Sequence, residues 1–307
     1  MSNPADADHC REKEIAARFR ALWDVLRPTG EGTVDEFRSL MRDRIRDALD
    51  RGAGKVIDGQ EVEFIANTFV IDHLIAENTA TQVHAVRHRD TGKIHALKCA
   101  KPECHSDPII RDFLLREAEI GLTLCHPHII RTHMLLRLQD GRPAILMEKG
   151  GLSLSARAGQ GLLSARMIPE VVRGVLLALD HLSRVDRVHA DISPGNILVA
   201  AEDPSIWKLC DFGLCRRQGE RLPLDDLARA GTDAFQAPEQ ASGVGPDQRS
   251  DLYSLGRVLQ WMLDKHTQGE PVDDGLRRLA AHLTMARPDD RPEHAQACLE
   301  RYGLSPL

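Results

Sequence analysis

The chain has 307 residues, of which 42% are hydrophobic and 28% charged, and its formal net charge is −6. These proportions are typical of a globular protein with a buried core and exclude a disordered chain. The mildly acidic balance argues against bulk nucleic-acid binding, which usually needs a basic face, so no nucleic-acid partner is expected.

The sequence carries no clear membrane or export signal. No stretch approaches the ~20 apolar residues that cross a bilayer, and residues 1–10 lack the apolar centre of a signal peptide. We therefore expect no membrane span and a cytoplasmic location, with export as an effector through another kind of signal as the alternative. The 7 cysteines are odd in number and irregularly spaced, which predicts reduced thiols.

Residues 1–66 are predicted to form an N-terminal helical extension. Apolar side chains recur at helical spacing in residues 11–28, and Thr33–Glu36 has the form of a capping box before a second amphipathic stretch that reaches residue 51. Two interpretations stay open. The helices pack on the domain that follows, or they act in autoinhibition or bind a regulatory partner.

From Phe69 onward the pattern changes to short strands. Strands and one helix are predicted in this part of the chain, with a turn at residues 90–92. They span Phe69–Ala76, Gln82–Arg89, Ile94–Ala100, the helix Ile110–Leu124 and the strand Ala144–Met147.

After Gly150-Gly151 the chain becomes mostly helical. Long amphipathic helices are predicted around residues 168–179 and 252–262, and two short strands, Ile197–Ala200 and Trp207–Cys210, lie between them. A strand-rich part followed by a helical part predicts an α+β fold. We expect a small lobe over residues 67–148, with an antiparallel sheet and one helix, and a larger helical lobe over residues 149–307.

Acidic and amide side chains stand at two positions of this second part. Asp191 and Asn196 lie in a loop before a short strand, and Asp211 ends the next strand, where Gly213 permits a sharp turn. Carboxylate and amide oxygens are the ligands that Mg²⁺ prefers, together with the phosphates of a substrate. The pattern therefore predicts a magnesium-dependent reaction on a phosphate compound.

The stretches around Asp191–Asn196 and Asp211–Gly213 resemble the catalytic loop and the Asp-Phe-Gly motif of the eukaryotic-type protein kinase family, and the compact chain resembles its bacterial members. The resemblance covers about residues 67–305. It implies a two-lobed protein kinase fold and transfer of the γ-phosphate of ATP to serine or threonine hydroxyls of a protein substrate. It also implies that Asp191 accepts the hydroxyl proton and that Asn196 and Asp211 hold Mg²⁺.

The same resemblance assigns the ATP site. Ile94–Lys98 is similar to the family's lysine-bearing strand, so Lys98 would contact the α- and β-phosphates. Glu117 on the following helix would hold its ammonium group, with Glu119 as the alternative. The remaining ATP-binding positions would be Val83, Ala96, the gatekeeper Met147, the hinge residues Glu148 and Gly150, and Leu198.

Three further residues resemble structural elements of the family. Glu239, in the Ala-Pro-Glu sequence that ends the activation segment, would form a buried ion pair with Arg291. Asp251 resembles the acid that begins a central helix and braces the catalytic loop.

The chain departs from the family pattern at the loop that covers the phosphates. Ala76, Asn78 and Thr81 stand where glycines are typical. Glycines let backbone amides approach phosphates without interference from a Cβ atom, so weaker nucleotide binding is expected. Ser193 replaces a lysine that contacts the γ-phosphate, which predicts a slower enzyme.

Two more departures concern regulation. Ala190 replaces the arginine that receives a phosphorylated activation loop, and Thr232 is the only hydroxyl side chain between Gly213 and Ala237. We therefore expect activity that needs no loop phosphorylation, with Asp225 and Asp226 providing fixed charge.

Gly121 falls where a large apolar side chain usually packs above the Phe212 ring. We expect Leu122 or the N-terminal helices to fill that space. Two other functions stay open. The lost glycines favour a pseudokinase that acts as a scaffold, and a small-molecule kinase on a related fold is the second alternative.

Overall fold

The computed structural model describes residues 64–65, 68–104, 107–138, 140–221, 233–266 and 271–304. The chain divides into two units, residues 1–71 and 72–307. The helices predicted in residues 11–51, and Asp225, Asp226 and Thr232, lie outside the described residues. The boundaries at residues 66/67 and 148/149 stay predictions.

The first lobe is built on a six-stranded sheet in the order β1-β2-β3-β4-β6-β5. The pairs β3–β4 and β4–β6 are antiparallel, as predicted, and β5–β6 is antiparallel as well. The edge strand β5 was not predicted. The strands are β1 (Phe64–Ile65), β2 (Phe69–Glu77), β3 (Thr81–His88), β4 (Ile94–Ala100), β5 (Thr132–Arg137) and β6 (Pro143–Glu148).

The register of this sheet gathers four of the predicted ATP-binding residues. Val83 on β3 is the partner of Lys98 on β4, and Met147 on β6 is the partner of Ala96. Directly opposed residues share a face of the sheet, and so do residues two apart on one strand. Strand pairing alone therefore places these four side chains on the same side.

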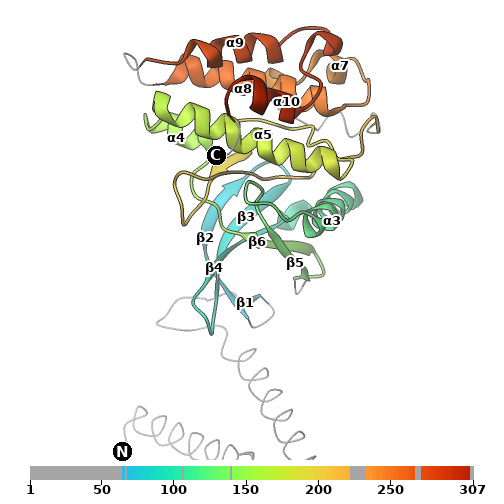
Figure 1. Ribbon diagram of the computed structural model, residues 1–307. Helices are drawn as coiled ribbons and strands as arrows, with labels where there is room; N and C mark the ends of the chain where they lie inside the picture. Colours follow the sequence, from blue (N-terminus) through green and yellow to red (C-terminus); the bar gives the residue numbers. More distant parts are fainter. Residues whose placement is uncertain are drawn as a thin grey trace, which may run out of the picture. The chain divides into compact units, whose positions relative to one another are not determined.

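Helix α3 (Pro108–Thr123) covers the sheet (Figure 1). It begins at Asp107, whose side chain accepts hydrogen bonds from the amides of Ile109 and Ile110, and proline stands at its first position, where no backbone donor is needed. Leu114 and Ala118 pack with the sheet in a small apolar core. The helix thereby presents Glu117, one turn from Leu114, toward β4.

The second lobe is mostly helical, which confirms the α+β class of two-lobed fold. Its core lies between α5 and α8, with Trp207 fully buried beside them. Its helices are α4 (Leu154–Gly159), α5 (Ile168–Arg184), α7 (Pro238–Ala241), α8 (Gln248–Lys265), α9 (Asp274–Leu283) and α10 (Ala295–Arg301), and its strands are β7 (Ile197–Val199) and β8 (Trp207–Leu209). None of the helices described is long and apolar enough to cross a membrane.

A buried ion pair joins α7 to the segment that follows α9. Arg291 makes two parallel bonds to the Glu239 carboxylate, at 2.7 and 2.9 Å. Its remaining donors bond the carbonyl oxygens of Met285, Ala286 and Arg249. Every donor of the guanidinium group is therefore used, which is the condition under which a buried charge is tolerated.

Thr132 occupies the space beside Gly121. A Cβ atom on Gly121 would lie 3.1 Å from the Cβ atom of Thr132 and still closer to its hydroxyl. Leu122 is 49% exposed, so the expectation that Leu122 fills this gap was wrong. The close approach of α3 to β5 decides this point, and the sequence carried no sign of β5.

Gly121→Ala tests this contact. Alanine in a helix interior normally stabilises by about 1 kcal/mol, whereas overpacking costs about 1–3 kcal/mol. We expect net destabilisation in the wild type and stabilisation in a Thr132→Ala background, measured by urea unfolding of all four proteins. Equal stabilisation in both backgrounds would show that the two residues do not touch.

Candidate active site

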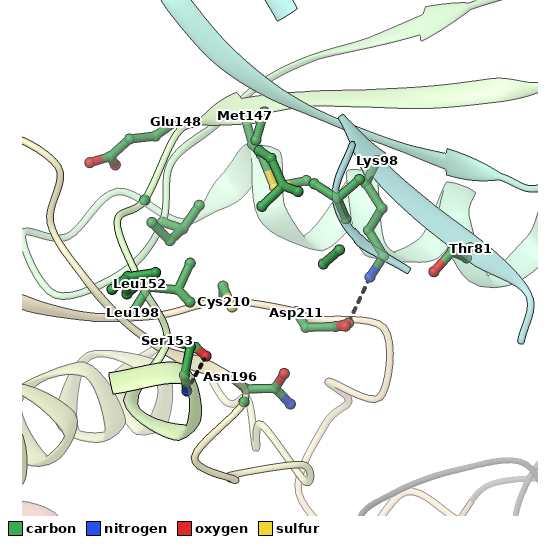
Figure 2. Close-up of a pocket in the computed structure, with 18 of the residues that line it drawn as sticks. Thr81, Lys98, Met147, Glu148, Leu152, Ser153, Asn196, Leu198, Cys210 and Asp211 are labelled. Carbon is green, nitrogen blue, oxygen red and sulfur yellow. Dashed lines mark hydrogen bonds and ion pairs between the residues drawn. The ribbon is translucent and has the colours of Figure 1, made fainter. Parts of the chain in front are cut away.

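A cavity of about 330 Å³ lies between the sheet and the helical lobe (Figure 2). Every ATP-binding position predicted from the sequence lines it, and so do Asn196 and Asp211. Asp191 lines an adjoining cavity of about 760 Å³, which also contains Lys98 and Asp211. The tertiary structure therefore brings together residues that lie more than a hundred positions apart in the sequence.

The hinge between the lobes runs close to β7. A Cβ atom on Gly150 would lie 2.6 Å from the end of the Leu198 side chain, so a larger residue at position 150 would require Leu198 to shift. The side chain of Glu148 is held by Lys208 of β8 at 2.7 Å. Lys208 thereby fixes the position of the Glu148 carboxylate.

Lys98 is held between two carboxylates. Its Nζ atom lies 2.8 Å from Glu117 and 2.9 Å from Asp211. Burial by itself would lower the pKa of Lys98, but Asp211 and Glu117 outweigh it, so the pKa is raised and the ammonium group stays charged. Glu119 is exposed, so Glu117 is the residue that meets the lysine.

Asn196 orients the acid of the catalytic loop. Its Nδ2 atom donates to the backbone oxygen and the carboxylate of Asp191, both at 2.8 Å. Both donors are thereby used, and the amide oxygen of Asn196 remains available. The Asp211 side chain is 37% exposed. Both side chains line the 330 Å³ cavity, and amide and carboxylate oxygens are ligand types that Mg²⁺ prefers.

The catalytic loop contains a strained residue that is held from both sides. Ala190 has a φ angle of 65°, which a non-glycine residue rarely adopts. Its amide and that of His189 donate to Asp251, at 2.8 and 2.7 Å. The side-chain amide of Gln240 donates to its carbonyl oxygen at 3.2 Å. Strain of this kind persists only where the surroundings over-determine it, as they do here.

The ring of His189 joins the catalytic loop to the strand that ends in Asp211. Its Nε2 atom donates to the carbonyl oxygen of Cys210 at 3.1 Å, and its Nδ1 atom accepts from the amide of Asp191 at 3.3 Å. These two partners require the neutral ring. Burial lowers the pKa of His189 to about 4, which agrees with this protonation state.

Several residues of the site were not predicted. Ile130, Leu152, Ser153 and Cys210 also line the cavity, and Gln240 holds Ala190. Leu152 and Ser153 follow the Gly150-Gly151 pair directly, so a hinge at the glycines was the available signal. Nothing in the local sequence marks Gln240, because its partner is 50 residues away.

A family model described as protein kinase domain matches residues 69–294, well over half of the chain. The chain belongs to the protein kinase family.

The curated relatives of this protein kinase include bacterial and human proteins. A probable serine/threonine-protein kinase PknB of Bifidobacterium longum is 32% identical over 213 residues, or 64% of this chain and 30% of that protein. Serine/threonine-protein kinase PknJ of Mycobacterium tuberculosis is 31% identical over 216 residues, 69% of this chain and 35% of that protein. The human serine/threonine-protein kinase D2 is 29% identical over 231 residues, 72% of this chain and 26% of that protein. This kinase chain spans about a third of the length of these relatives.

Ser193, where this kinase lacks the family's lysine, is only 5% exposed. It is absent from the linings of both cavities among the residues described. The Ser193 hydroxyl therefore does not take the place of that lysine beside the cavity. The part of the chain that the structure describes contains no group of three or more His, Cys, Asp or Glu side chains placed to hold a metal ion.

His189 predicts a defined loss of stability in acid. Its pKa is about 4 in the folded protein and 6.5 ordinarily. The unfolded chain therefore binds the proton first, and the contribution of the neutral ring is complete above pH 6.5 and lost as the pH falls toward 4. Between pH 7 and pH 4.5 the loss is about 2–3 kcal/mol.

Denaturant unfolding at these two pH values measures the effect. The His189→Asn variant should lose less stability between them than the wild type does. His73 is an exposed histidine on β2, and a His73→Asn control should behave like the wild type. Equal losses in all three proteins would contradict the assignment of the neutral ring.

Proposed function

We propose that this chain transfers the γ-phosphate of ATP to serine or threonine hydroxyls of a protein substrate. The observation that carries the proposal is the joint placement of Lys98, Asp211, Asn196 and Asp191 around two adjoining cavities. The names of the relatives support the choice of serine and threonine. Pro194 supports the same choice, because the catalytic loop with proline at this position resembles the serine/threonine type of the family rather than the tyrosine type.

In the proposed reaction the substrate hydroxyl oxygen attacks the γ-phosphorus in line with the bond to the bridging oxygen of ADP. A new P–O bond forms, the bond to ADP breaks, and the hydroxyl proton passes to the Asp191 carboxylate. Asn196 keeps that carboxylate oriented through its 2.8 Å bond. Lys98 would orient the α- and β-phosphates while Glu117 and Asp211 keep it in place.

Mg²⁺ is the proposed metal ion, and Asn196 and Asp211 are its proposed ligands. When bound with ATP it would neutralise charge on the phosphates. Asp211 has a φ angle of 64°, and its carboxylate accepts from the amide of Gly213 at 3.3 Å. The turn at Gly213 thereby fixes the direction of this carboxylate.

We also propose that the activity does not depend on a phosphorylated activation loop. Arg116 of α3, next to Glu117, makes an ion pair with Glu220 at 3.0 Å. Glu220 also accepts from the amide of Arg217 at 3.0 Å. A carboxylate from the segment after Asp211 therefore already links that segment to the helix bearing Glu117. This link has the chemistry that a phosphate would otherwise provide.

Asp191→Asn tests the reaction. The variant keeps the size of the side chain and removes the base, so phosphotransfer to an acceptor protein should fall by about 10²–10⁴-fold. Radioactive phosphate transfer from ATP with Mg²⁺ measures it, and acid hydrolysis of the product identifies the phosphorylated residue. Asp264 is exposed on α8, and Asp264→Asn should retain full activity. Absence of transfer by the wild type would favour the scaffold alternative.

Glu220→Gln tests the second proposal. The two side chains of the pair are 32% and 44% exposed, so the pair contributes only about 0.2–1 kcal/mol. We expect kcat to fall a few-fold with little change in unfolding free energy. Mass spectrometry of the active wild type should find Thr232 unmodified. Stoichiometric phosphate on Thr232 would contradict independence from phosphorylation.

A further inference from the structure

The turn between β2 and β3 is closed by one side chain. The backbone amide of Asn78 donates to the carbonyl oxygen of Thr81 at 3.0 Å, which forms a tight turn. The Oδ1 atom of Asn78 accepts from the amides of Ala80 and Thr81, at 2.9 and 2.7 Å, and from the Thr81 hydroxyl at 3.2 Å. Asn78 therefore holds the turn through both its backbone and its side chain.

These bonds change what the turn offers to a phosphate. In the family's glycine-rich loop, backbone amides approach the phosphates. Here the amides of Ala80 and Thr81 already donate to Asn78. Thr81 also carries a Cβ atom where the family has glycine. These two backbone amides are therefore unavailable to a nucleotide.

The same bonds determine how the Asn78 amide is oriented. An atom that accepts from two backbone N–H groups must be the oxygen, so the Nδ2 atom is the one that remains. No acceptor for Nδ2 is found among the described residues. Asn78 lines both the 330 Å³ cavity and the 760 Å³ cavity. Two N–H donors are thus held at the border of these cavities.

The cavities are short of positive charge. Lys98 is the only cationic side chain among the described residues that line them, and it already pairs with Glu117 and Asp211. Glu77, at the end of β2, also lines the smaller cavity, and its negative charge is balanced by an ion pair with Lys101 at 2.8 Å. A polyphosphate in the cavity would have few other protein donors on this side.

We propose that Asn78 is a phosphate-contacting residue, with its Oδ1 atom closing the turn and its Nδ2 atom donating to the β- or γ-phosphate of the nucleotide. One side chain thereby supplies the donor that glycine-rich loops take from their backbone. The inference rests on the proposed ATP site and names a contact that this chain makes differently from its family.

Two variants separate the donor from the turn. Asn78→Ser keeps a side-chain oxygen that accepts backbone amides in turns, and it removes the donor without adding charge. Asn78→Gly removes both and releases the amides of Ala80 and Thr81. Thr91 closes the turn between β3 and β4, where its hydroxyl accepts from the amide of Lys93 at 3.3 Å, and it lines neither cavity. Thr91→Ala is therefore the matched control.

Calorimetric titration with adenosine, ADP and ATP, in the presence of Mg²⁺, measures the contact. A lost hydrogen bond to a charged group predicts about ten-fold weaker binding of ATP or ADP by Asn78→Ser. Adenosine affinity should be unchanged and serves as the test of folding. Asn78→Gly should bind ATP more tightly than Asn78→Ser, because its backbone amides are free. Thr91→Ala should match the wild type with all three ligands.

Three results would overturn the inference. They are equal ATP affinity in Asn78→Ser and the wild type, an equal loss for adenosine and ATP in that variant, and a wild type that binds adenosine as tightly as ATP. Phosphotransfer by the same preparations decides the proposed function separately. Transfer with an unaltered Asn78→Ser affinity refutes the contact alone, whereas a phosphate-dependent affinity without transfer refutes the activity and supports the contact.

Discussion

The buried ammonium group of Lys98 determines how the parts of this kinase must be arranged. It needs two carboxylates, one from α3 and one from the strand end at Asp211, and each lies within 3 Å. A buried charge that loses a partner costs about 3–5 kcal/mol. The position of α3 and the turn at Asp211 are therefore coupled to each other through one side chain. Lys98 of the first lobe and Asp211 of the second lobe meet at this point.

The second constraint is the shape of the catalytic loop. Ala190 adopts a left-handed conformation, and its amide and carbonyl groups are held by Asp251 and Gln240. The two partners come from different helices, α8 and α7. In turn Glu239, next to Gln240, is fixed by the fully used guanidinium group of Arg291. A chain of polar contacts thus connects the loop bearing Asp191, through α7, to Arg291.

Where the sequence departs from the family pattern, another side chain makes a hydrogen bond, a packing contact or an ion pair at the same place. The side-chain oxygen of Asn78 accepts hydrogen bonds from two backbone amides in a turn that lacks the family's glycines. Thr132 fills the space that Gly121 leaves. The carboxylate of Glu220 meets Arg116 in a chain that has Ala190 in place of an arginine. Thr132 and Glu220 lie outside the motifs that changed, whereas Asn78 stands inside one, and in all three cases the replacement depends on contacts that the motif letters do not record.

Much of the fold could be predicted from the sequence, because its signals are local. Strand and helix periodicity marked β2, β3, β4, β6 and α3 within one or two residues of their ends, and it located α5 and α8 but made both too short, by three to five residues at the misplaced ends. The edge strand β5 escaped, since its side chains are only partly buried and show no clean alternation. The ATP-binding positions came from motif spacing, and the register of β3, β4 and β6 then explains why they share one face.

The order of residue types by itself determined the lobes, the family and the residues that carry the proposed chemistry, because these depend on short-range spacing along the chain. Only the tertiary structure decided which atoms meet. Contacts in the folded chain decide which side chain occupies the space beside Gly121. They also decide which side chain holds Ala190 and which backbone amides of the Asn78 turn are already used. Such contacts are set by packing and hydrogen-bond geometry, which the linear pattern does not record.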